Sequence, residues 1–137
     1  MTENTTPKQV LSHRMKDKAL MHFVSCANIG AGVGITLLVN GQVVYGDLIS
    51  GKEYCEQMYK KISSAKGDPL LAESIASYFN KLGENTYTKE NNADVPLNYL
   101  HLEKVAYLKG DGHQVNMNGT LLRIRIEDVN GFSLGRP

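Results

Sequence analysis

The pair Asn40-Gly41 is the feature that most constrains how this chain can fold. Both central residues of a type I′ turn need a positive φ, which asparagine and glycine adopt at least cost. Apolar residues alternate before the pair, at Val33, Ile35, Leu37 and Val39. Residues 42–49 supply the returning strand, and Gly46 within it predicts a bulge where a curved sheet brings backbones together. The sequence therefore predicts a tight antiparallel hairpin.

Three glycines precede this hairpin, at Gly30, Gly32 and Gly34. A phosphate-binding loop places its glycines between a strand and the next helix, whose amides then point at the anion. Here a predicted helix precedes the glycines and a strand follows, and no Lys-Ser or Lys-Thr pair comes next. The glycine-rich segment is therefore interpreted as a linker.

An N-terminal helix is expected from about Pro7 to Cys26, because Thr6 can cap it and the φ of Pro7 is already helical. Residues 1–5 are expected to be a flexible N-terminus. The apolar stripe of this helix comprises Leu11, Met15, Ala19, Phe23 and Cys26. That spacing of three and four residues predicts a helix lying on a sheet.

Two more helices are expected between strands. Residues 50–53 fit a capping box, in which the Ser50 hydroxyl accepts from an amide and Glu53 reaches back. Asp68-Pro69 begins the second helix, which Gly83 closes. The two form a helical hairpin. Residues 84–94 have no apolar periodicity and are rich in asparagine, threonine and charge, which predicts a mobile loop.

The β pattern returns from Val95, with a strand that is apolar on both faces and therefore expected to be buried on two sides. Turns are expected at residues 110–112, 118–119 and 130–131, with a strand over 120–127. All 137 residues fit one domain. The predicted fold class is α+β: an N-terminal helix packed on a small, strongly bent antiparallel β-barrel, with an inserted helical hairpin.

Composition excludes several classes of function. The 15 basic and 14 acidic residues give a net charge of +1, so general nucleic-acid packaging and attraction to acidic membranes are not expected. No segment resembles a signal peptide or is long and apolar enough to span a bilayer. Cys26 and Cys55 form no Cys-x-x-Cys and the histidines show no zinc-ligand spacing, so we expect reduced thiols, a cytoplasmic protein and no metal or cofactor.

Two pairs of residues could transfer protons if a cleft brought them to a substrate, namely His101 with Glu103 and Asp111 with His113. Nothing in the sequence supplies that cleft, and no neighbouring histidine or lysine cluster activates Cys26 or Cys55. His101 with Glu103 is interpreted as a sheet-edge histidine beside a solvated carboxylate, and Asp111 with His113 as residues near a turn. An enzyme would need a deep pocket beside His101 or His113, and nothing in the sequence predicts one. Enzymatic activity is therefore not expected.

Arg123 and Arg125 project from the same face of one predicted strand. They could bind phosphate or carboxylate through two parallel hydrogen bonds, or they could simply form the solvated outer face of the sheet. If they do more than that, they mark a partner surface together with Lys104 on the preceding strand. Both interpretations remain open at this point.

Residues 35–49 resemble the first half of the Sm-like and SH3-like barrels, through Asn40-Gly41 followed by Gly46. The resemblance implies a bent five-stranded barrel below an N-terminal helix. The Sm-like RNA site has no counterpart here. Its third loop usually carries an aspartate or histidine followed by an asparagine, where this chain has Gly51-Lys52-Glu53. The later Arg-Gly turn of the family is absent too, because isoleucines follow Arg123 and Arg125. An Sm-like RNA-binding module is kept as the alternative function.

A broader resemblance extends along nearly the whole chain. It rests on TTPKQ (5–9), MKDKALMHFVS (15–25), ITLLVNGQVVYGDLISGKEY (35–54) and GTLLRIRIEDVNGFSLG (119–135). These segments resemble the gas vesicle accessory proteins of the GvpU family. The resemblance implies a non-enzymatic cytoplasmic protein that associates with gas vesicles and affects their assembly or clustering. It implies no residue-level site.

The residues agree with a protein that works through contacts with gas vesicle proteins and with copies of itself. Its near-zero net charge does little to keep copies apart. Exposed strand edges could provide weak multivalent contacts. Tyrosine-rich segments could do the same, and they hold Tyr54, Tyr59, Tyr87, Tyr99 and Tyr107.

Overall fold

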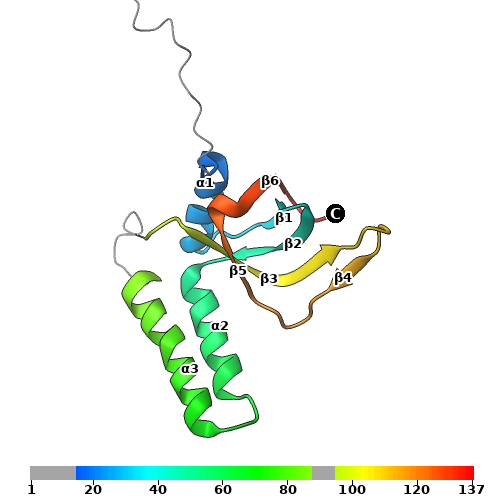
Figure 1. Ribbon diagram of the computed structural model, residues 1–137. Coiled ribbons are helices and arrows are strands. Elements are labelled where there is room, and N and C mark those ends of the chain that lie inside the picture. Colours follow the sequence, from blue (N-terminus) through cyan, green and yellow to red (C-terminus); the bar gives the residue numbers. More distant parts are fainter. Residues whose placement is uncertain (1–14, 88–94) are drawn as a thin grey trace, which may run out of the picture.

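The structure is a computed structural model that describes residues 15–87 and 95–137. Within these ranges it contains three α-helices and six strands, joined by one π-helical turn and one 3-10 turn (Figure 1). The elements are α1 (Lys18–Asn28), β1 (Gly34–Val39), β2 (Gln42–Ile49), α2 (Gly51–Ser63), α3 (Pro69–Leu82), η2 (Gly83–Tyr87), β3 (Tyr99–Leu108), β4 (Gln114–Asn116), β5 (Leu122–Arg125), η4 (Ile126–Asp128) and β6 (Val129–Leu134).

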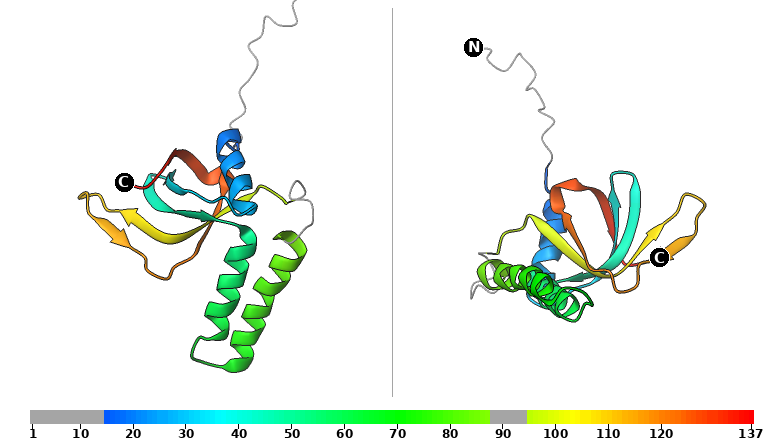
Figure 2. Two further views of the ribbon diagram at one scale, coloured as in Figure 1. Left: turned by 180° about the vertical axis from the view of Figure 1, so that it is seen from behind. Right: turned by 60° about the horizontal axis from the view of Figure 1, so that its bottom comes forward.

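The six strands form one antiparallel sheet in the order β4-β3-β2-β1-β6, and β5 also pairs with β3. The sheet is strongly curled and α1 lies against one side of it, while α2 and α3 project from it as a helical hairpin (Figure 1 and Figure 2). This architecture confirms the predicted combination of helices with an antiparallel sheet. Among the described residues no strand pairing joins β6 to β4 or β5, so the sheet is not closed and the Sm-like barrel remains a prediction.

The predicted hairpin is confirmed. Val39 pairs with Gln42, and the φ angles of Asn40 and Gly41 are 50° and 84°. The bulge at Gly46 is confirmed as well, because the β2–β3 register shifts between Tyr45 and Asp47. A Cβ at Gly46 would lie 3.0 Å from the Leu102 Cβ, so glycine permits this close approach.

The bulge places Lys104 in the left-handed region, with a φ of 50°. A side chain costs energy in this conformation, and glycine does not bear that cost. We expect Lys104→Gly to raise the free energy of unfolding by about 0.5 to 1 kcal/mol, measured by chemical denaturation. The matched control is Lys60→Gly, an exposed lysine in α2, which should lower it by about 1 kcal/mol. A destabilised Lys104→Gly would contradict the strain argument.

Helix α1 begins later than the sequence predicted. Residues 1–14, with the predicted start at Pro7, lie outside the described residues, and residues 15–17 are not helical. Asp17 caps the helix, since its Oδ1 accepts from the amides of Ala19 and Leu20 at 2.8 and 3.1 Å. The predicted stripe is wrong in its phase: Leu20, Val24 and Ala27 are buried, whereas Met15 is 81% exposed. Both stripes have the same spacing, and packing on the sheet selects between them.

The starts of α2 and α3 are confirmed. Ser50 Oγ accepts from the Glu53 amide at 2.9 Å, and Asp68 Oδ1 accepts from the Leu70 amide at 3.0 Å. Helix α3 ends at Leu82 with Gly83 as its C-cap residue, as predicted, but Gly83 keeps right-handed helical angles and the chain continues into the π-helical turn η2.

The predicted loop 84–94 is therefore helical where the structure describes it. Residues 84–87 belong to η2, and 88–94 lie outside the described residues. Tyr87 at the end of this turn is buried against Gly51, where a Cβ would lie 2.3 Å from its ring. This packing holds the helical turn after Gly83 against the start of α2.

The turns at Gly112 and Gly119 are confirmed, with φ angles of 89° and 79°. The turn predicted at Asn130-Gly131 is wrong, since both residues lie inside β6. There the β1–β6 register shifts between Leu38 and Val39, and Asn130 Oδ1 accepts from the Asn40 amide at 2.7 Å. The Asn-Gly pair thus fits a strand irregularity beside the β1–β2 turn.

Two apolar clusters hold these elements together. The larger one joins α1 to the curled sheet through residues such as Leu20, Ile35, Leu37, Leu100 and Ile126. The smaller one joins the helical hairpin to the sheet, and it contains Ile49, Tyr54, Cys55, Tyr87 and Val95. The hairpin is therefore attached at its base and not along its length.

Candidate partner-binding surfaces

Arg123 lies at the base of the helical hairpin, on β5 opposite His101 of β3. Its Nη1 donates to the Tyr87 hydroxyl at 3.0 Å and to His101 Nε2 at 2.9 Å. Its guanidinium also lies over the Tyr99 ring, 3.8 Å from the centroid. We call Arg123, His101, Tyr54, Tyr87 and Tyr99 the Arg123 cluster. It joins η2 and α2 to the sheet through a charged group stacked on aromatic rings.

His101 is buried in this cluster, with 2% of its surface exposed. Burial, assisted by the Arg123 charge, lowers the pKa of His101 to about 3. The ring is therefore neutral at pH 7, and because Nε2 accepts from Arg123 the proton lies on Nδ1. The predicted sheet-edge position is wrong, because β3 has β2 on one side and β5 on the other at this residue.

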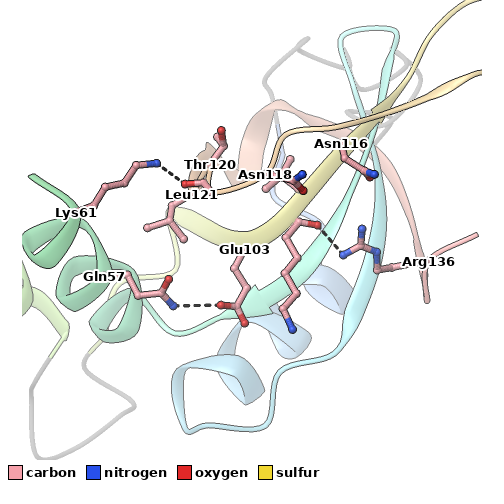
Figure 3. Close-up of a pocket in the computed structure, with 11 residues that line it drawn as sticks. Gln57, Lys61, Glu103, Asn116, Asn118, Thr120, Leu121 and Arg136 are labelled. Atoms are coloured by element: carbon pink, nitrogen blue, oxygen red, sulfur yellow. Dashed lines mark hydrogen bonds between the residues drawn. The ribbon is translucent and has the colours of Figure 1, made fainter. Parts of the chain in front are cut away.

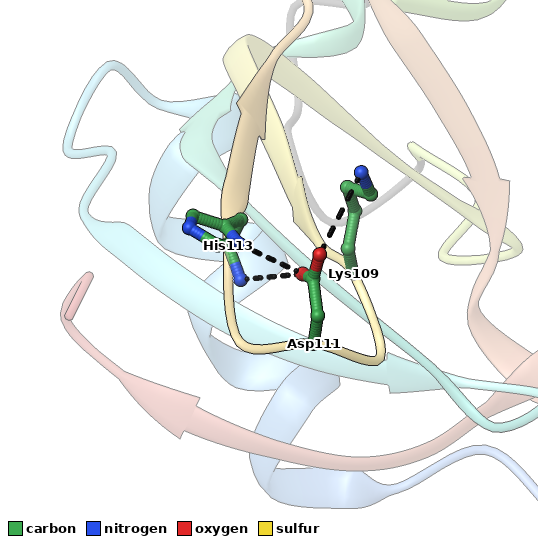
Figure 4. Close-up of polar contacts among 3 residues, drawn as sticks. All are labelled: Lys109, Asp111 and His113. Carbon is green, nitrogen blue, oxygen red and sulfur yellow. Dashed lines mark hydrogen bonds and ion pairs between the residues drawn. The ribbon is translucent and has the colours of Figure 1, made fainter.

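Neither proton-transfer pair is assembled as a catalytic pair in a deep pocket. Glu103 accepts from Gln57 Nε2 at 3.1 Å, away from the partners of His101. His113 Nδ1 lies 3.1 Å from Asp111 Oδ1, and the His113 amide donates to the same oxygen at 3.0 Å (Figure 4). These two side chains are 81% and 54% exposed at the tip of the β3–β4 turn. Their contacts shape the turn.

The two cysteines occupy different surroundings. Cys55 is buried, and burial raises its pKa to about 11, so the thiol stays protonated at neutral pH. Cys26 is half-buried, with its Sγ 3.8 Å from His22 Nε2 one helical turn earlier. The sequence interpretation missed this histidine, although a spacing of four residues on a predicted helix indicates it.

Lys104 lines an open, polar pocket of about 400 Å³ between α2 and the sheet (Figure 3). Lys61 and Arg136 bring further positive charge to its lining, Glu103 brings negative charge, and Asn116 and Asn118 contribute amides. Several of these groups already have partners. Lys61 Nζ donates to the Gly119 carbonyl, and Arg136 Nη1 donates to the Lys104 carbonyl at 2.7 Å. The pocket is thus a polar surface depression with a surplus of positive charge.

Arg125 is on the same strand as Arg123 but has acidic neighbours. Its guanidinium pairs with the carboxylates of Glu127 and, at 3.7 Å, Asp128. In the described part of the chain no contact joins Lys104 to either arginine. The three predicted surface residues therefore lie in three settings: a pocket, an aromatic cluster and an exposed ion pair.

The tyrosines are less available for contacts than the sequence suggested. Tyr54 and Tyr87 are buried, and Tyr99 and Tyr107 are half-buried, whereas Tyr59 on α2 is 42% exposed. The expectation of an exposed tyrosine-rich surface is therefore wrong for Tyr54 and Tyr87, whose rings pack at the base of the hairpin.

Helix α3 exposes several large apolar side chains. Leu71, Ile75 and Tyr78 are 59%, 42% and 62% exposed. Ala76 is 1% exposed and is the buried residue of this helix. A helix that buries a small residue and exposes large ones leaves an apolar surface for a partner.

Two kinds of site are not found within the ranges that the structure describes. No three histidine, cysteine, aspartate or glutamate side chains gather there as metal ligands. No helix in those ranges is long and apolar enough to cross a membrane.

Comparison with known proteins places these features in a family. Searches of curated proteins and of solved structures find no match. The protein family described as gas vesicle protein GvpU-like matches residues 17–137, which include the whole sheet, the helical hairpin and α1. This match confirms the resemblance seen in the sequence. The chain belongs to the GvpU-like family of gas vesicle proteins.

Proposed function

We propose that this protein is a non-enzymatic, cytoplasmic accessory protein that associates with gas vesicles and affects their assembly or clustering. It does so through contacts with gas vesicle proteins and through self-association. The observation that carries this proposal is the family match over residues 17–137. The exposed apolar side chains of α3 support the mode of action, because exposed apolar groups gathered on one element are typical of protein interaction surfaces.

The proposed contacts with gas vesicle proteins use Lys104 and Arg125, whose exposed side chains lie at two separate places on the protein. Lys104 adds its charge to the pocket lined by Lys61 and Arg136, which suits a carboxylate on the partner. Arg125 can exchange Glu127 for a partner carboxylate, since an exposed ion pair contributes little stability. Arg123 supports these contacts indirectly, by fixing the hairpin to the sheet.

Co-flotation with isolated gas vesicles tests the proposal. The wild-type protein should float with the vesicles, and the double variant Lys104→Gln, Arg125→Gln should float several-fold less, because it loses two charges from the contact. The matched control is Lys18→Gln, Lys66→Gln, which removes two exposed charges elsewhere and should float normally. Circular dichroism should show all three proteins folded.

Each outcome bears on a separate part of the proposal. Wild-type protein that does not float would contradict the association with gas vesicles. Normal flotation of the Lys104 and Arg125 variant would exclude these two residues as contacts and leave the association with gas vesicles intact. Purified protein that carries RNA and binds uridine-rich strands in a salt-dependent way would favour the Sm-like RNA-binding alternative.

A further inference from the structure

Exposed apolar surface concentrates on α3. Of the ten large apolar side chains that are exposed among the described residues, four belong to this helix: Leu70, Leu71, Ile75 and Tyr78. Helix α3 instead packs on α2 around Ala76, and at its end a Cβ on Gly83 would lie only 3.2 Å from the Cys55 Cβ. Ala76 of α3 thus faces α2, and an adjoining stripe on α3 exposes the large side chains of Leu71, Ile75 and Tyr78.

The intervals between the residues of this stripe are the same when they are counted from either end of α3. Leu71, Ile75, Tyr78 and Leu82 are separated by four, three and four residues, so they lie on one face of α3. The first three are exposed, whereas Leu82 is half-buried and also packs on the smaller apolar cluster at the base of the hairpin. A second α3 running antiparallel would place Leu71 against Leu82 of the second copy, and Ile75 against Tyr78. This arrangement is symmetric about a two-fold axis between Ala76 and Ser77, as in an isologous dimer. We therefore propose that two copies of this protein pair through antiparallel α3 helices.

The charges of α3 are compatible with this pairing. The helix contains two charged residues, Glu73 and Lys81. At about 100° per residue, Glu73 lies on the opposite side from the stripe, so the two acidic groups do not meet. Lys81 lies beside the stripe, next to Leu70 and Ser74 of the second copy. Its aliphatic stem can cover Leu70, which is 77% exposed.

The position of the hairpin also permits the pairing. It projects away from the sheet, so the tip of one hairpin can reach the base of the other (Figure 1 and Figure 2). The stripe lies roughly a quarter turn around α3 from the face on α2, so both contacts can form together. A helix of 14 residues is about 21 Å long, and one stripe on it covers much less than the ~800 Å² per partner of a stable interface. The dimer is therefore weak and reversible.

This inference rests on the proposed self-association and names its surface. Sedimentation of the full chain over a range of concentrations should show a monomer–dimer equilibrium. Leu71→Gln, Ile75→Gln should raise the dissociation constant about tenfold or more, since it removes four apolar side chains from one dimer. Leu38→Gln, Leu134→Gln replaces two exposed apolar residues on the sheet and should leave the equilibrium unchanged.

Crosslinking tests the orientation, in a Cys26→Ser background so that the half-buried native thiol does not react. Under mild oxidation, a mixture of Ile75→Cys and Tyr78→Cys chains should form a mixed disulfide. Leu71→Cys alone should not, because an antiparallel pair places its two copies about 16 Å apart along the helices.

The outcomes separate the surface from the function. A monomer at every concentration would overturn the dimer, whereas association with gas vesicles is measured independently by flotation. Dimerisation that survives Leu71→Gln, Ile75→Gln would overturn the α3 surface and leave self-association standing. Rapid crosslinking of Leu71→Cys with itself would overturn the antiparallel orientation.

Discussion

Gly32→Ala should lower the free energy of unfolding by about 3 kcal/mol, the upper part of the range for inserting an atom into packed structure. A Cβ on Gly32 would lie 2.0 Å from the Leu48 carbonyl oxygen and 3.1 Å from its carbon. No side-chain rotation can relieve this overlap, because both atoms are backbone. The Leu48 amide also donates to the Val33 carbonyl at 2.9 Å, so moving the linker strains the neighbouring hydrogen bond.

Chemical denaturation followed by circular dichroism measures this loss. Gly131→Ala is the matched control, since a Cβ there meets no atom within 4 Å and its φ is not left-handed. It should change the free energy of unfolding by less than about 0.5 kcal/mol. Equal effects at both positions would show that the approach of Leu48 does not determine the cost. The glycine-rich linker therefore has a steric role, in line with its interpretation as a non-phosphate segment.

The features predicted correctly follow from interactions within a few residues. A positive φ at Asn40 and Gly41 specifies the β1–β2 turn, and the Ser50 and Asp68 side chains accept from amides two or three residues later. Such preferences act before the chain folds, so they can be deduced from short segments. The bulge at Gly46 belongs to the same group, because a glycine inside a strand weakens the strand and commonly marks a bulge or a close approach of backbones.

The features predicted wrongly depend on residues far apart in the chain. Residues 84–87 continue as a helical turn because Tyr87 packs against Gly51, and Asn130 lies in a strand because it bonds to Asn40. The phase of the α1 stripe is likewise decided by the sheet beneath it. None of these partners is visible in the local pattern that suggested the wrong structure.

The candidate surface shows the same division. Alternation along β5 predicts that Arg123 and Arg125 share one face, yet their surroundings differ because their neighbours come from other elements. Lys104 does not join them, since β5 pairs with β3 only from Tyr99 to Leu102, and Lys104 lies beyond that segment, at the bulge opposite Gly46. The acidic residues at 127 and 128 were the one local sign that Arg125 has its own partners.

Acid should destabilise this protein through His101. In the unfolded chain His101 binds a proton as the pH falls below about 6.5. In the folded protein burial lowers the pKa of His101 to about 3, so the folded state binds this proton only near pH 3. Between these values the unfolded state holds more protons, and the free energy of unfolding falls as the pH falls. The contribution of His101 reaches about 1.4 kcal/mol per pH unit, or roughly 2 to 3 kcal/mol at pH 4.5.

His101→Gln isolates this contribution, because an amide oxygen can accept from Arg123 but does not titrate. Denaturation at pH 7.5 and at pH 4.5 should show that the variant loses about 2 to 3 kcal/mol less than the wild type between the two values. Carboxylates also titrate in this range, and comparing the two proteins removes their effect. His113→Gln changes an exposed histidine and should keep the wild-type pH dependence. If His101→Gln also keeps the wild-type pH dependence, His101 is not held neutral in the folded state at pH 4.5, and the acid effect comes from other groups.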